Sequence, residues 1–440
     1  MIRVITYGTF DLLHYGHIRL LERAKALGDY LIVGITSDDF DKSRGKINVH
    51  QSLMERIEAI RSTGLADKII VEEYEGQKID DIQRYEVDIF TVGSDWLGKF
   101  DYLNEYCKVI YLERTQGISS TDIRNKNTAI KLGFAGDSEI IKKFLTELSY
   151  VNGIIPEAIY TTNKNDYGIK KVSCYSDLLN TVDAVYLCSM PDEHFNQIKE
   201  ALALGKHVLC ESPIALSAPQ CIELYSLAED MNCILMDSIK TAYSTAYSRL
   251  LALAKGGKIG DIISIDATAT SLRDCDKISQ KKINKVWNSI CAWGPTVLLP
   301  IFQLLGVHYK SKQIVSKLND DTFDLFTKID FIYEKAVATI KVGKGIKSEG
   351  ELIISGTKGY IYVPAPWWKT DYFEIRYENS EHNKRYFYQL DGEGIRYELV
   401  AFVKAIETSK SRSYIDVQTS QAICTVIEDF YSRIDFVEIC

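Results

Sequence analysis

The amino-acid sequence predicts an α/β protein with two successive parallel-sheet units and a third region whose sheet is mostly antiparallel. Residues 2–7 form a short apolar run rich in β-branched side chains, Gly8 ends it, and helical spacing of apolar residues begins at Ile18. The same order of strand, glycine and helix restarts at Ala129. Beyond residue 258, alternating segments rich in Tyr and Phe indicate antiparallel strands.

The first strand-to-helix junction carries two histidines. His14 and His17 are three residues apart at the start of the first helix, so both side chains can reach one ligand. Gly16 lies between them and leaves room for a phosphate beside the backbone. Open α/β sheets bind ligands at the carboxyl ends of their strands, and helix N-termini attract anions. The pair therefore predicts a site for phosphoryl or nucleotidyl transfer. A metal-binding pair and two core histidines are the alternatives.

A hydroxyl-rich segment follows the last strand of this unit. Residues 109–112 are typical of a buried strand, and Arg114 comes directly after it with the run 119–121, Ser-Ser-Thr. Hydroxyls and N–H groups at a helix start can hold phosphate oxygens, and a planar guanidinium suits phosphate. We expect this segment and the histidine pair to bind one phosphate chain from opposite ends of the unit.

Residues 1–125 resemble the glycerol-3-phosphate cytidylyltransferase family, and the shared stretches are residues 7–17, 20–25, 93–96, 98–101 and 114–121. In that family the histidine pair and the later segment bind the triphosphate of CTP and stabilise the transition state. The catalytic roles that this resemblance implies fall on His14, His17, Lys46 and Arg114. The nucleotide-binding roles fall on Thr9, Phe10, Asp11, Gly16, Asp95, Trp96, Thr115, Gly117, Ile118, Ser119, Ser120 and Thr121.

The acceptor is a polyol phosphate whose identity stays open. Arg56 fits one arginine of the family pattern, whereas Gly64 stands where another is expected. Glycerol-3-phosphate, glycerol-2-phosphate and a longer polyol phosphate are the candidates. Such a phosphate is already an anionic nucleophile, so the transfer requires no catalytic base. We expect Mg²⁺ to bridge the triphosphate oxygens, with the nucleotide itself supplying much of the coordination.

Composition narrows the class of protein. A chain of 440 residues predicts two to three domains, and the formal net charge of −8 argues against a nucleic-acid partner. Its 10 cysteines form no CxxC motif, which favours reduced thiols in the core. Neither a signal peptide nor a membrane span is expected. The sequence therefore favours a cytoplasmic protein, and we expect a homodimer or a higher homo-oligomer.

Most of residues 129–440 resemble the glucose–fructose oxidoreductase and inositol dehydrogenase family, through residues 182–186, 190–194, 201–213 and 354–360. The resemblance implies a second Rossmann domain that binds NAD(P) and an α+β domain that supplies the substrate pocket. We place the domains at 1–127, 128–247 and 248–440, with the antiparallel sheet near 258–375 and closing helices near 394–408 and 416–433. The candidate NAD(P)-binding residues are Gly133, Gly136, Ser138 and Glu211.

This half departs from its family pattern at three places. Ser212 stands where the family has a catalytic lysine, and residues 292–300 lack the family's later Asp and His pair. In the glycine loop, Ser138 replaces a glycine, and bulky Ile141 is expected near the pyrophosphate path. His194 is a further candidate for a site, although a surface or helix-start position suits it at least as well. Trp367 and Trp368 could line a pocket, although aromatic residues in a sheet more often belong to the core.

Two hypotheses describe the second half. In one it is an active NAD(P)-dependent reductase that supplies the polyol phosphate to the first half. In the other it is a degenerate fold kept for dimerisation, acceptor binding or docking, which the missing groups favour. For the whole chain, the intact first motifs favour a CTP-dependent cytidylyltransferase that makes CDP-glycerol or a related CDP-polyol for teichoic acid or capsule synthesis. The rival is an oxidoreductase with a vestigial nucleotide domain.

Overall fold

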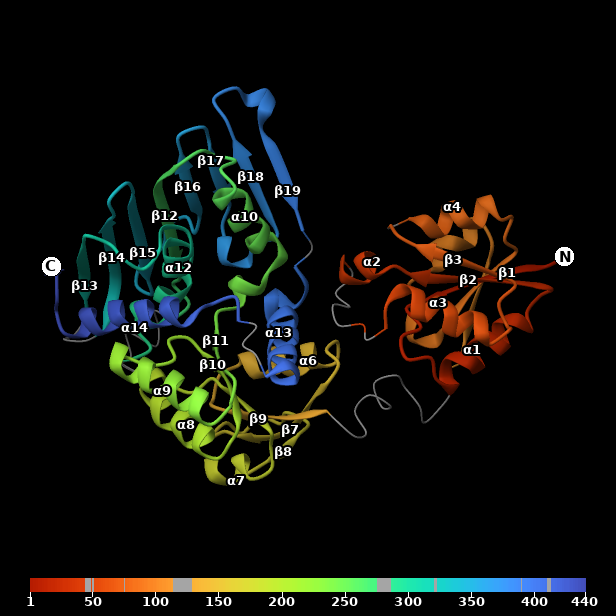
Figure 1. The fold of residues 1–440 in the computed structure, drawn as a ribbon, viewed down its shortest axis with the longest axis horizontal. Coiled ribbons are helices and arrows are strands. Elements are labelled where there is room, and N and C mark those ends of the chain that lie inside the picture. Colours follow the sequence, from red (N-terminus) through yellow and green to blue (C-terminus); the bar gives the residue numbers. More distant parts are fainter. Residues whose placement is uncertain are drawn as a thin grey trace. The chain divides into compact units, whose positions relative to one another are not determined.

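The computed structural model describes residues 1–43, 49, 51–74, 76–113, 129–274, 286–319, 323–388, 390–409 and 413–440. The chain divides into two units, one of Met1–Ala129 with Tyr150–Gly153 and one of Ile130–Ser149 with Ile154–Cys440 (Figure 1). The predicted domain boundary at 127/128 lies outside the described residues. Each unit is described by itself below.

The first unit is a five-stranded parallel sheet in the order β3-β2-β1-β4-β5. Its strands are β1 (Arg3–Gly8), β2 (Tyr30–Thr36), β3 (Lys68–Glu72), β4 (Ile89–Gly93) and β5 (Lys108–Leu112). Its α-helices are α1 (Tyr15–Lys25), α2 (Asp38–Ser43), α3 (Leu53–Ser62) and α4 (Gln77–Arg84), and its 3₁₀ helices are η1 (Ser94–Trp96) and η2 (Asp101–Glu105). The strand order reverses between β1 and β4, which marks the position where such sheets bind ligands.

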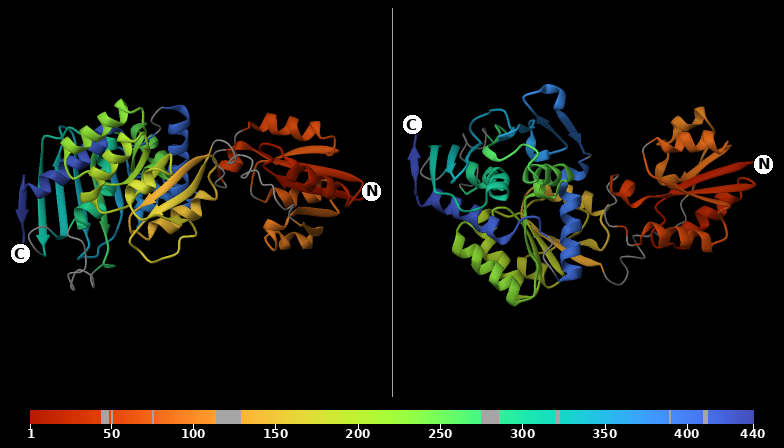
Figure 2. Two further views of the ribbon diagram at one scale, coloured as in Figure 1. Left: turned by 90° about the horizontal axis from the view of Figure 1, so that it is seen from below. Right: turned by 45° about the horizontal axis from the view of Figure 1, so that its top comes forward.

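Helices cover both faces of this sheet. Val4 packs in one cluster with Leu21 of α1, whereas its neighbour Ile5 packs in another with Ile82 of α4. Figures 1 and 2 show α1 and α3 on one side of the sheet and α4 on the other. A strand buried on both faces is apolar without alternation, which explains the continuous run at residues 2–7.

The second unit begins with a six-stranded parallel sheet in the order β11-β10-β9-β6-β7-β8. Its strands are β6 (Ile130–Ala135), β7 (Ile154–Tyr160), β8 (Lys170–Lys171), β9 (Ala184–Leu187), β10 (His207–Glu211) and β11 (Leu235–Ser238). Its helices are α6 (Ile140–Leu148), α7 (Tyr175–Leu179), α8 (Pro191–Ala203) and α9 (Ala218–Asp230). The segments η3 (Lys240–Tyr243) and α10 (Thr245–Lys255) lead out of it.

A nine-stranded mixed sheet follows, in the order β19-β18-β17-β16-β12-β15-β14-β13-β20. Its strands are β12 (Ile262–Thr270), β13 (Ser311–Leu318), β14 (Asp324–Ile332), β15 (Val337–Gly343), β16 (Leu352–Gly356), β17 (Tyr360–Val363), β18 (Tyr372–Arg376), β19 (Lys384–Phe387) and β20 (Phe436–Glu438). The helical segments are α12 (Ser289–Leu305), η4 (Trp367–Lys369), η5 (Ser380–His382), η6 (Asp391–Gly394), α13 (Ile395–Thr408) and α14 (Val417–Tyr431). Only the pairs β12/β15 and β13/β20 are parallel among the described strands, so the sheet is mostly antiparallel.

The predicted fold class is confirmed, and the two closing helices lie within a few residues of their predicted bounds. Two details differ. The sheet continues beyond residue 375 to β19 and takes in β20 from the end of the chain. Helix α12, which packs on β12 and β15, has no counterpart among the predicted elements, and it contains Pro295 and Pro300.

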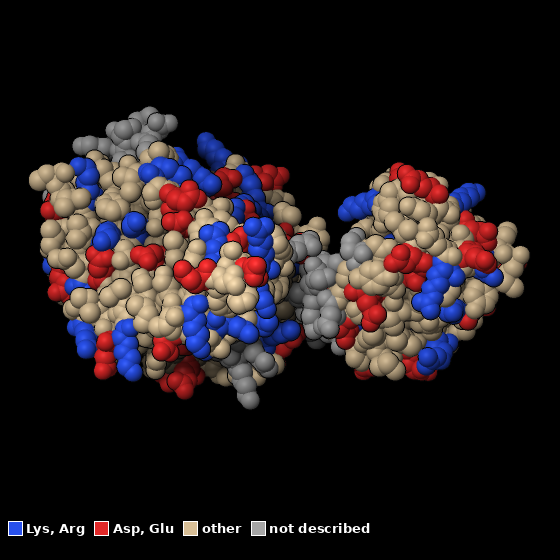
Figure 3. Space-filling view, turned by 90° about the horizontal axis from the view of Figure 1, so that it is seen from above, with Lys and Arg blue, Asp and Glu red and all other residues tan. Residues whose placement is uncertain are grey.

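The surface charges and the cysteines are arranged as follows. Basic and acidic side chains are interspersed on the face of each unit shown in Figure 3. The described cysteines are all unpaired, and six of them are buried. Across the described ranges, no helix has the length and apolar character needed to cross a bilayer.

Candidate functional site

The structure brings the two predicted histidines together at the start of α1. His14 is the N-cap residue, and its Nδ1 accepts a hydrogen bond from the Gly16 N–H at 3.0 Å. The His14 and His17 rings stack with centroids 3.8 Å apart, and the edge of Phe10 lies against His17 at 5.5 Å. Because Nδ1 of His14 accepts, its neutral ring carries hydrogen on Nε2, which can donate to a phosphate oxygen. No group of three potential metal ligands occurs among the described residues, so nothing described completes a metal site around the pair.

The loop between β1 and α1 has an unusual backbone conformation. Phe10 and Leu12 adopt left-handed φ angles of 51° and 47°, which side chains of this kind seldom adopt. Gln51 stabilises this loop: its N–H donates to Asp11 Oδ1 at 2.9 Å, and its Oε1 accepts from the Leu12 N–H at 2.7 Å. A Cβ on Gly8 would come within 3.0 Å of the Phe10 ring, so this glycine makes room for the aromatic side chain beside the histidines.

The Arg56 side chain connects the loop between β1 and α1 to the rest of the first unit. This side chain is fully buried, and Nη1 donates to the carbonyl oxygens of Thr9 and Thr36, each at 2.8 Å. The guanidinium also forms ion pairs with Asp38, and with Asp41 at 3.7 Å. These contacts connect the ends of β1 and β2 and leave the guanidinium without solvent access. Arg56 therefore positions the loop, whereas the sequence indicated only that it matched a family arginine.

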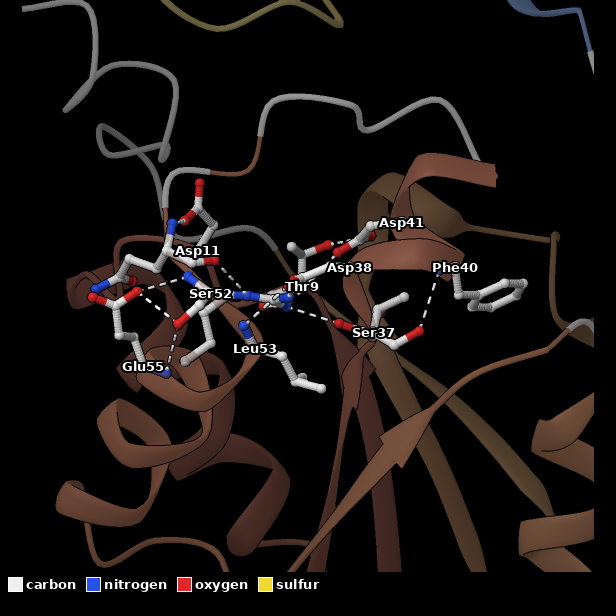
Figure 4. Close-up of polar contacts among 12 residues, drawn as sticks. Thr9, Asp11, Ser37, Asp38, Phe40, Asp41, Ser52, Leu53 and Glu55 are labelled. Carbon is white, nitrogen blue, oxygen red and sulfur yellow. Dashed lines mark hydrogen bonds and ion pairs between the residues drawn. The ribbon is translucent and has the colours of Figure 1, made fainter. Parts of the chain in front are cut away.

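Thr9 and the start of α3 complete this network (Figure 4). The Thr9 hydroxyl donates to Asp41 Oδ1 at 2.9 Å. Ser52 caps α3: its hydroxyl accepts from the Glu55 N–H, and the Glu55 carboxylate accepts from the Ser52 N–H at 2.7 Å. This capping box fixes the helix that carries Arg56. The predicted residues Thr9, Phe10 and Asp11 thus belong to one preorganised loop.

A second polar cluster, which the sequence analysis missed, lies at the same edge of the sheet. The Tyr7 hydroxyl donates to Asp81 Oδ2 at 2.8 Å, and burial together with that carboxylate raises the pKa of Tyr7. Lys78 pairs with Glu72, the last residue of β3, and its ammonium lies 4.7 Å from the centre of the Tyr7 ring. Gln77 also donates to Asp81, at 3.0 Å. The available signal was an acidic residue at the end of an apolar strand, followed by a lysine in the next helix.

The other predicted nucleotide residues are placed only in part. Asp95 and Trp96 lie in η1, directly after β4, and Trp96 packs against Phe100 at 5.7 Å. Lys46 and the whole segment 114–121 lie outside the described residues. That segment contains Arg114, Thr115, Gly117, Ile118, Ser119, Ser120 and Thr121, whose roles stay predictions.

At the carboxyl ends of β6 and β9, the second unit has features of a dinucleotide-binding site. Gly136 has φ 130°, and an added Cβ would lie 2.5 Å from the Cys188 carbonyl carbon. Asp137 is turned to the loop after β7, where it accepts from the Thr161 hydroxyl at 2.6 Å. Ile141 is fully buried in the core, so it does not stand in the pyrophosphate path as expected. The glycine, the reversal of strand order and α6 therefore fit a dinucleotide.

Other candidates in this unit have structural explanations. Gly133 lies inside β6, where a Cβ would meet Leu178 of α7 at 2.9 Å. His194 is buried, with Nδ1 2.8 Å from the Pro213 carbonyl and Nε2 3.2 Å from the Ser189 carbonyl, so it joins two loops at the sheet edge. Burial lowers the pKa of His194. Trp367 is fully buried and donates to the Thr268 carbonyl at 3.0 Å, which makes it a core residue.

Comparison with solved structures supports the fold of the second unit. The chain is similar to KijD10, a 3-ketoreductase from Actinomadura kijaniata in complex with NADP and TDP-benzene, with TM-score 0.62 and 19% identity over 71% of this chain and 99% of that one. It is also similar to a levoglucosan dehydrogenase in complex with NADH and levoglucosan, with TM-score 0.60 and 15% identity over 69% and 96% of the two chains. At this identity the likeness concerns the fold.

Sequence comparison finds a family match in each unit. Residues 143–238 match the oxidoreductase family with an NAD-binding Rossmann fold, and residues 5–126 match the cytidylyltransferase-like family. The glycerol-3-phosphate cytidylyltransferase of Bacillus spizizenii is 54% identical over 124 residues, 28% of this chain and 95% of the relative. That of Staphylococcus aureus is 48% identical over 126 residues, 29% of this chain and 95% of the relative. Through its first unit, the chain belongs to the glycerol-3-phosphate cytidylyltransferase family.

Proposed function

We propose that the first unit transfers a cytidylyl group from CTP to a glycerol phosphate, forming CDP-glycerol and pyrophosphate. An oxygen of the acceptor phosphate bonds to the α-phosphorus of CTP, and the bond from that phosphorus to the bridging oxygen of the β-phosphate breaks. The observation that carries this proposal is the stacked His14–His17 pair at the start of α1, 3.8 Å apart, in a chain that covers 95% of a 54% identical relative.

Electrostatics explains why such a pair suits this reaction. Negative charge spreads over the phosphoryl oxygens and the departing pyrophosphate in the transition state. Donors held in place before the reaction stabilise that charge without reorganising. Nε2 of His14 can supply one such donor, and the start of α1 adds its N–H groups. We further propose that Lys46, Arg114 and the hydroxyls of 119–121 contribute the remaining positive charge and hydrogen bonds.

The Tyr7–Lys78 cluster lies at the carboxyl ends of β1 and β3, next to the loop that carries the histidines. Its lysine is paired with Glu72 and its tyrosine hydroxyl donates to Asp81, so the cluster stabilises this edge of the sheet and is not assigned to the acceptor phosphate. We propose that Mg²⁺ arrives with CTP, because the described residues offer no cluster of three or more ligands for it.

The test is a pyrophosphate-release assay with purified full-length protein and CTP. Glycerol-3-phosphate, glycerol-2-phosphate and a pentitol phosphate serve as acceptors, with glycerol as the matched control that lacks the nucleophilic phosphate. We expect release with at least one glycerol phosphate and none with glycerol. Absence of release with every phosphate would overturn the proposal.

The second unit and the cellular context complete the proposal. Gly136 and Ser138 would hold the phosphates of NAD(P), and bound NAD(P) would supply hydride chemistry at the edge where Glu211 lies. We propose a homodimer or a higher homo-oligomer that works in the cytoplasm, where reducing conditions suit its unpaired cysteines. Its CDP-linked product would feed a cell-surface polymer such as teichoic acid or capsule.

A further inference from the structure

A lysine lies at the ligand-binding edge of the second unit's parallel sheet. Glu211 ends β10 and pairs in register with Ser238, the last residue of β11. Lys240 opens η3 just beyond, and its Nζ lies 3.7 Å from Glu211 Oε1. Open α/β sheets bind their ligands at this edge. Among the ion pairs of the described residues, Lys240 is the cation that reaches Glu211.

Glu211 is itself held firmly. The Tyr186 hydroxyl of β9 donates to Glu211 Oε1, and the buried Tyr186 ring stacks on Phe144 of α6 at 3.9 Å. The oxygen that accepts from Tyr186 is also the one nearest the Lys240 ammonium, so Lys240 faces an acceptor that is already fixed in place. Because Glu211 balances the charge of Lys240, the pair suits a neutral oxygen such as a carbonyl or hydroxyl better than a phosphate.

Buried polar side chains surround the pair. Ser212, directly after Glu211, is a hydrogen-bond partner of Asp237, and Ser238 is one of Glu398, whose side chain is fully buried. Helix α13, which carries Glu398, packs on η3, which carries Lys240. Burial raises the pKa of Glu398 to about 8, so this carboxyl group is mostly neutral at pH 7. The edge therefore has a polar lining that suits a small hydroxylated molecule.

Two tryptophans, Trp368 and Trp293, are connected to the segment that carries Lys240. Thr241, next to Lys240, donates from its hydroxyl to the Trp368 carbonyl at 2.7 Å. The Trp368 ring lies 5.0 Å from that of Trp293 in α12, whose indole N–H is buried without a partner among the described residues. Flat apolar rings with a spare N–H donor suit a small polyhydroxylated molecule.

We propose that this edge is an oxidoreductase site for a small hydroxylated keto compound, in which Lys240 is the proton donor and Glu211 positions it. In the reducing direction, a hydride from a reduced nicotinamide dinucleotide bonds to the carbonyl carbon, and the π electrons of the C=O bond move to its oxygen. Lys240 Nζ donates one proton to that oxygen. The products are a secondary alcohol, the oxidised dinucleotide and a neutral amine that regains its proton from solvent.

We propose a triose phosphate as the keto compound, because its reduction connects the two units. Reduction of dihydroxyacetone phosphate yields a glycerol phosphate, the acceptor class of the first unit. This choice of substrate rests on the proposed cytidylyl transfer, whereas the role of Lys240 does not.

Three variants of the full-length protein test the role of Lys240. Lys240→Met removes the proton donor. Lys240→Arg keeps the charge beside Glu211 but replaces the amine with a group that does not deprotonate in proteins. Lys255→Met, at an exposed position in the last turn of α10, is the matched control.

Two readouts are taken on each variant. Energy transfer from tryptophan to the bound nicotinamide measures binding of NADPH and NADH, and absorbance at the nicotinamide band follows reduction of dihydroxyacetone and its phosphate. We expect both Lys240 variants to bind dinucleotide within about 3-fold of the parent and to lose at least about 100-fold in reduction rate. Methylamine should restore part of the rate to Lys240→Met.

The proposal is overturned if the parent binds neither dinucleotide, if it reduces neither keto compound, or if either Lys240 variant reduces at the parental rate. Pyrophosphate release from CTP is measured on the same preparations. Loss of reduction with intact release, or the reverse, therefore separates failure of this proposal from failure of cytidylyl transfer.

Discussion

The imidazole rings of His14 and His17 stack with their centroids 3.8 Å apart and their planes 23° apart. The Gly16 N–H bonds to Nδ1 of His14, which fixes the orientation of that ring. The Phe10 ring contacts the His17 ring edge to face, with centroids 5.5 Å apart. The three contacts place two imidazoles side by side at a helix start before any substrate arrives, which is the arrangement that electrostatic catalysis requires.

Replacing His17 with Ala should lower turnover by about two orders of magnitude, because it removes a preorganised group from the phosphate site. Pyrophosphate release at saturating CTP measures the effect, and circular dichroism checks that the variant is folded. Tyr15→Phe, at an exposed position of the same helix turn, is the control. A folded His17→Ala variant with near-parental turnover would contradict the assigned role.

Replacing Arg56 with Met should destabilise the first unit by about 3–5 kcal/mol, because buried Asp41 and two backbone carbonyls lose their partner. Arg61→Met is the matched control, since Arg61 forms an exposed pair with Glu58 and should cost less than about 1 kcal/mol. Hydrogen exchange of β1 and β2 peptides measures the free energy of unfolding of this unit alone. Equal exchange in the two variants would show that the Arg56 network contributes nothing.

Features that depend on the order of neighbouring residues could be predicted from the sequence. Side-chain contacts between segments that are distant in the sequence could not. The strand–loop–helix context of His14 and His17 can be inferred because a glycine and a change of periodicity mark it. The burial of Arg56 cannot, because its partners Thr9 and Thr36 come from two strands that only the folded sheet makes neighbours. The domain boundaries and the roles of the site residues stay predictions.

Lys78→Met should destabilise the first unit by about 3–5 kcal/mol, because it leaves the Glu72 carboxylate buried without its ammonium partner. Adding Glu72→Gln to that variant should recover part of the loss, since the uncompensated charge disappears. A double-mutant cycle, read from hydrogen exchange in β3, measures the coupling. Additive effects of the two changes would mean that the ion pair does not couple.

The stability of the second unit should fall as pH rises from about 5 to 8. Burial raises the pKa of Glu398 from 4.5 to about 8, so in this range the folded protein keeps a proton that the unfolded chain releases. Each pH unit then costs up to about 1.4 kcal/mol. Glu398→Gln should flatten this dependence and stabilise the unit at pH 8 relative to the parent. Urea unfolding at pH 5.5 and 8 measures the free energy of unfolding of the parent and of the variant. The same change in this free energy between the two pH values in both proteins would refute the prediction.

The proposed site of the second unit could not be found from the motif residues. Ser212 and the residues of α12 lack the side chains that the family pattern leads one to expect, which favoured a degenerate fold. The structure instead places Lys240, from the end of the next strand, beside Glu211. That juxtaposition comes from the pairing of β10 with β11 and has no local signature in the sequence.

A crystal structure of the protein with CTP and Mg²⁺ tests the central claim most directly. We predict that the triphosphate oxygens contact the imidazoles of His14 and His17 on one side and residues of segment 114–121 on the other. CTP bound elsewhere, or bound with the two imidazoles turned away from its phosphates, would contradict the account.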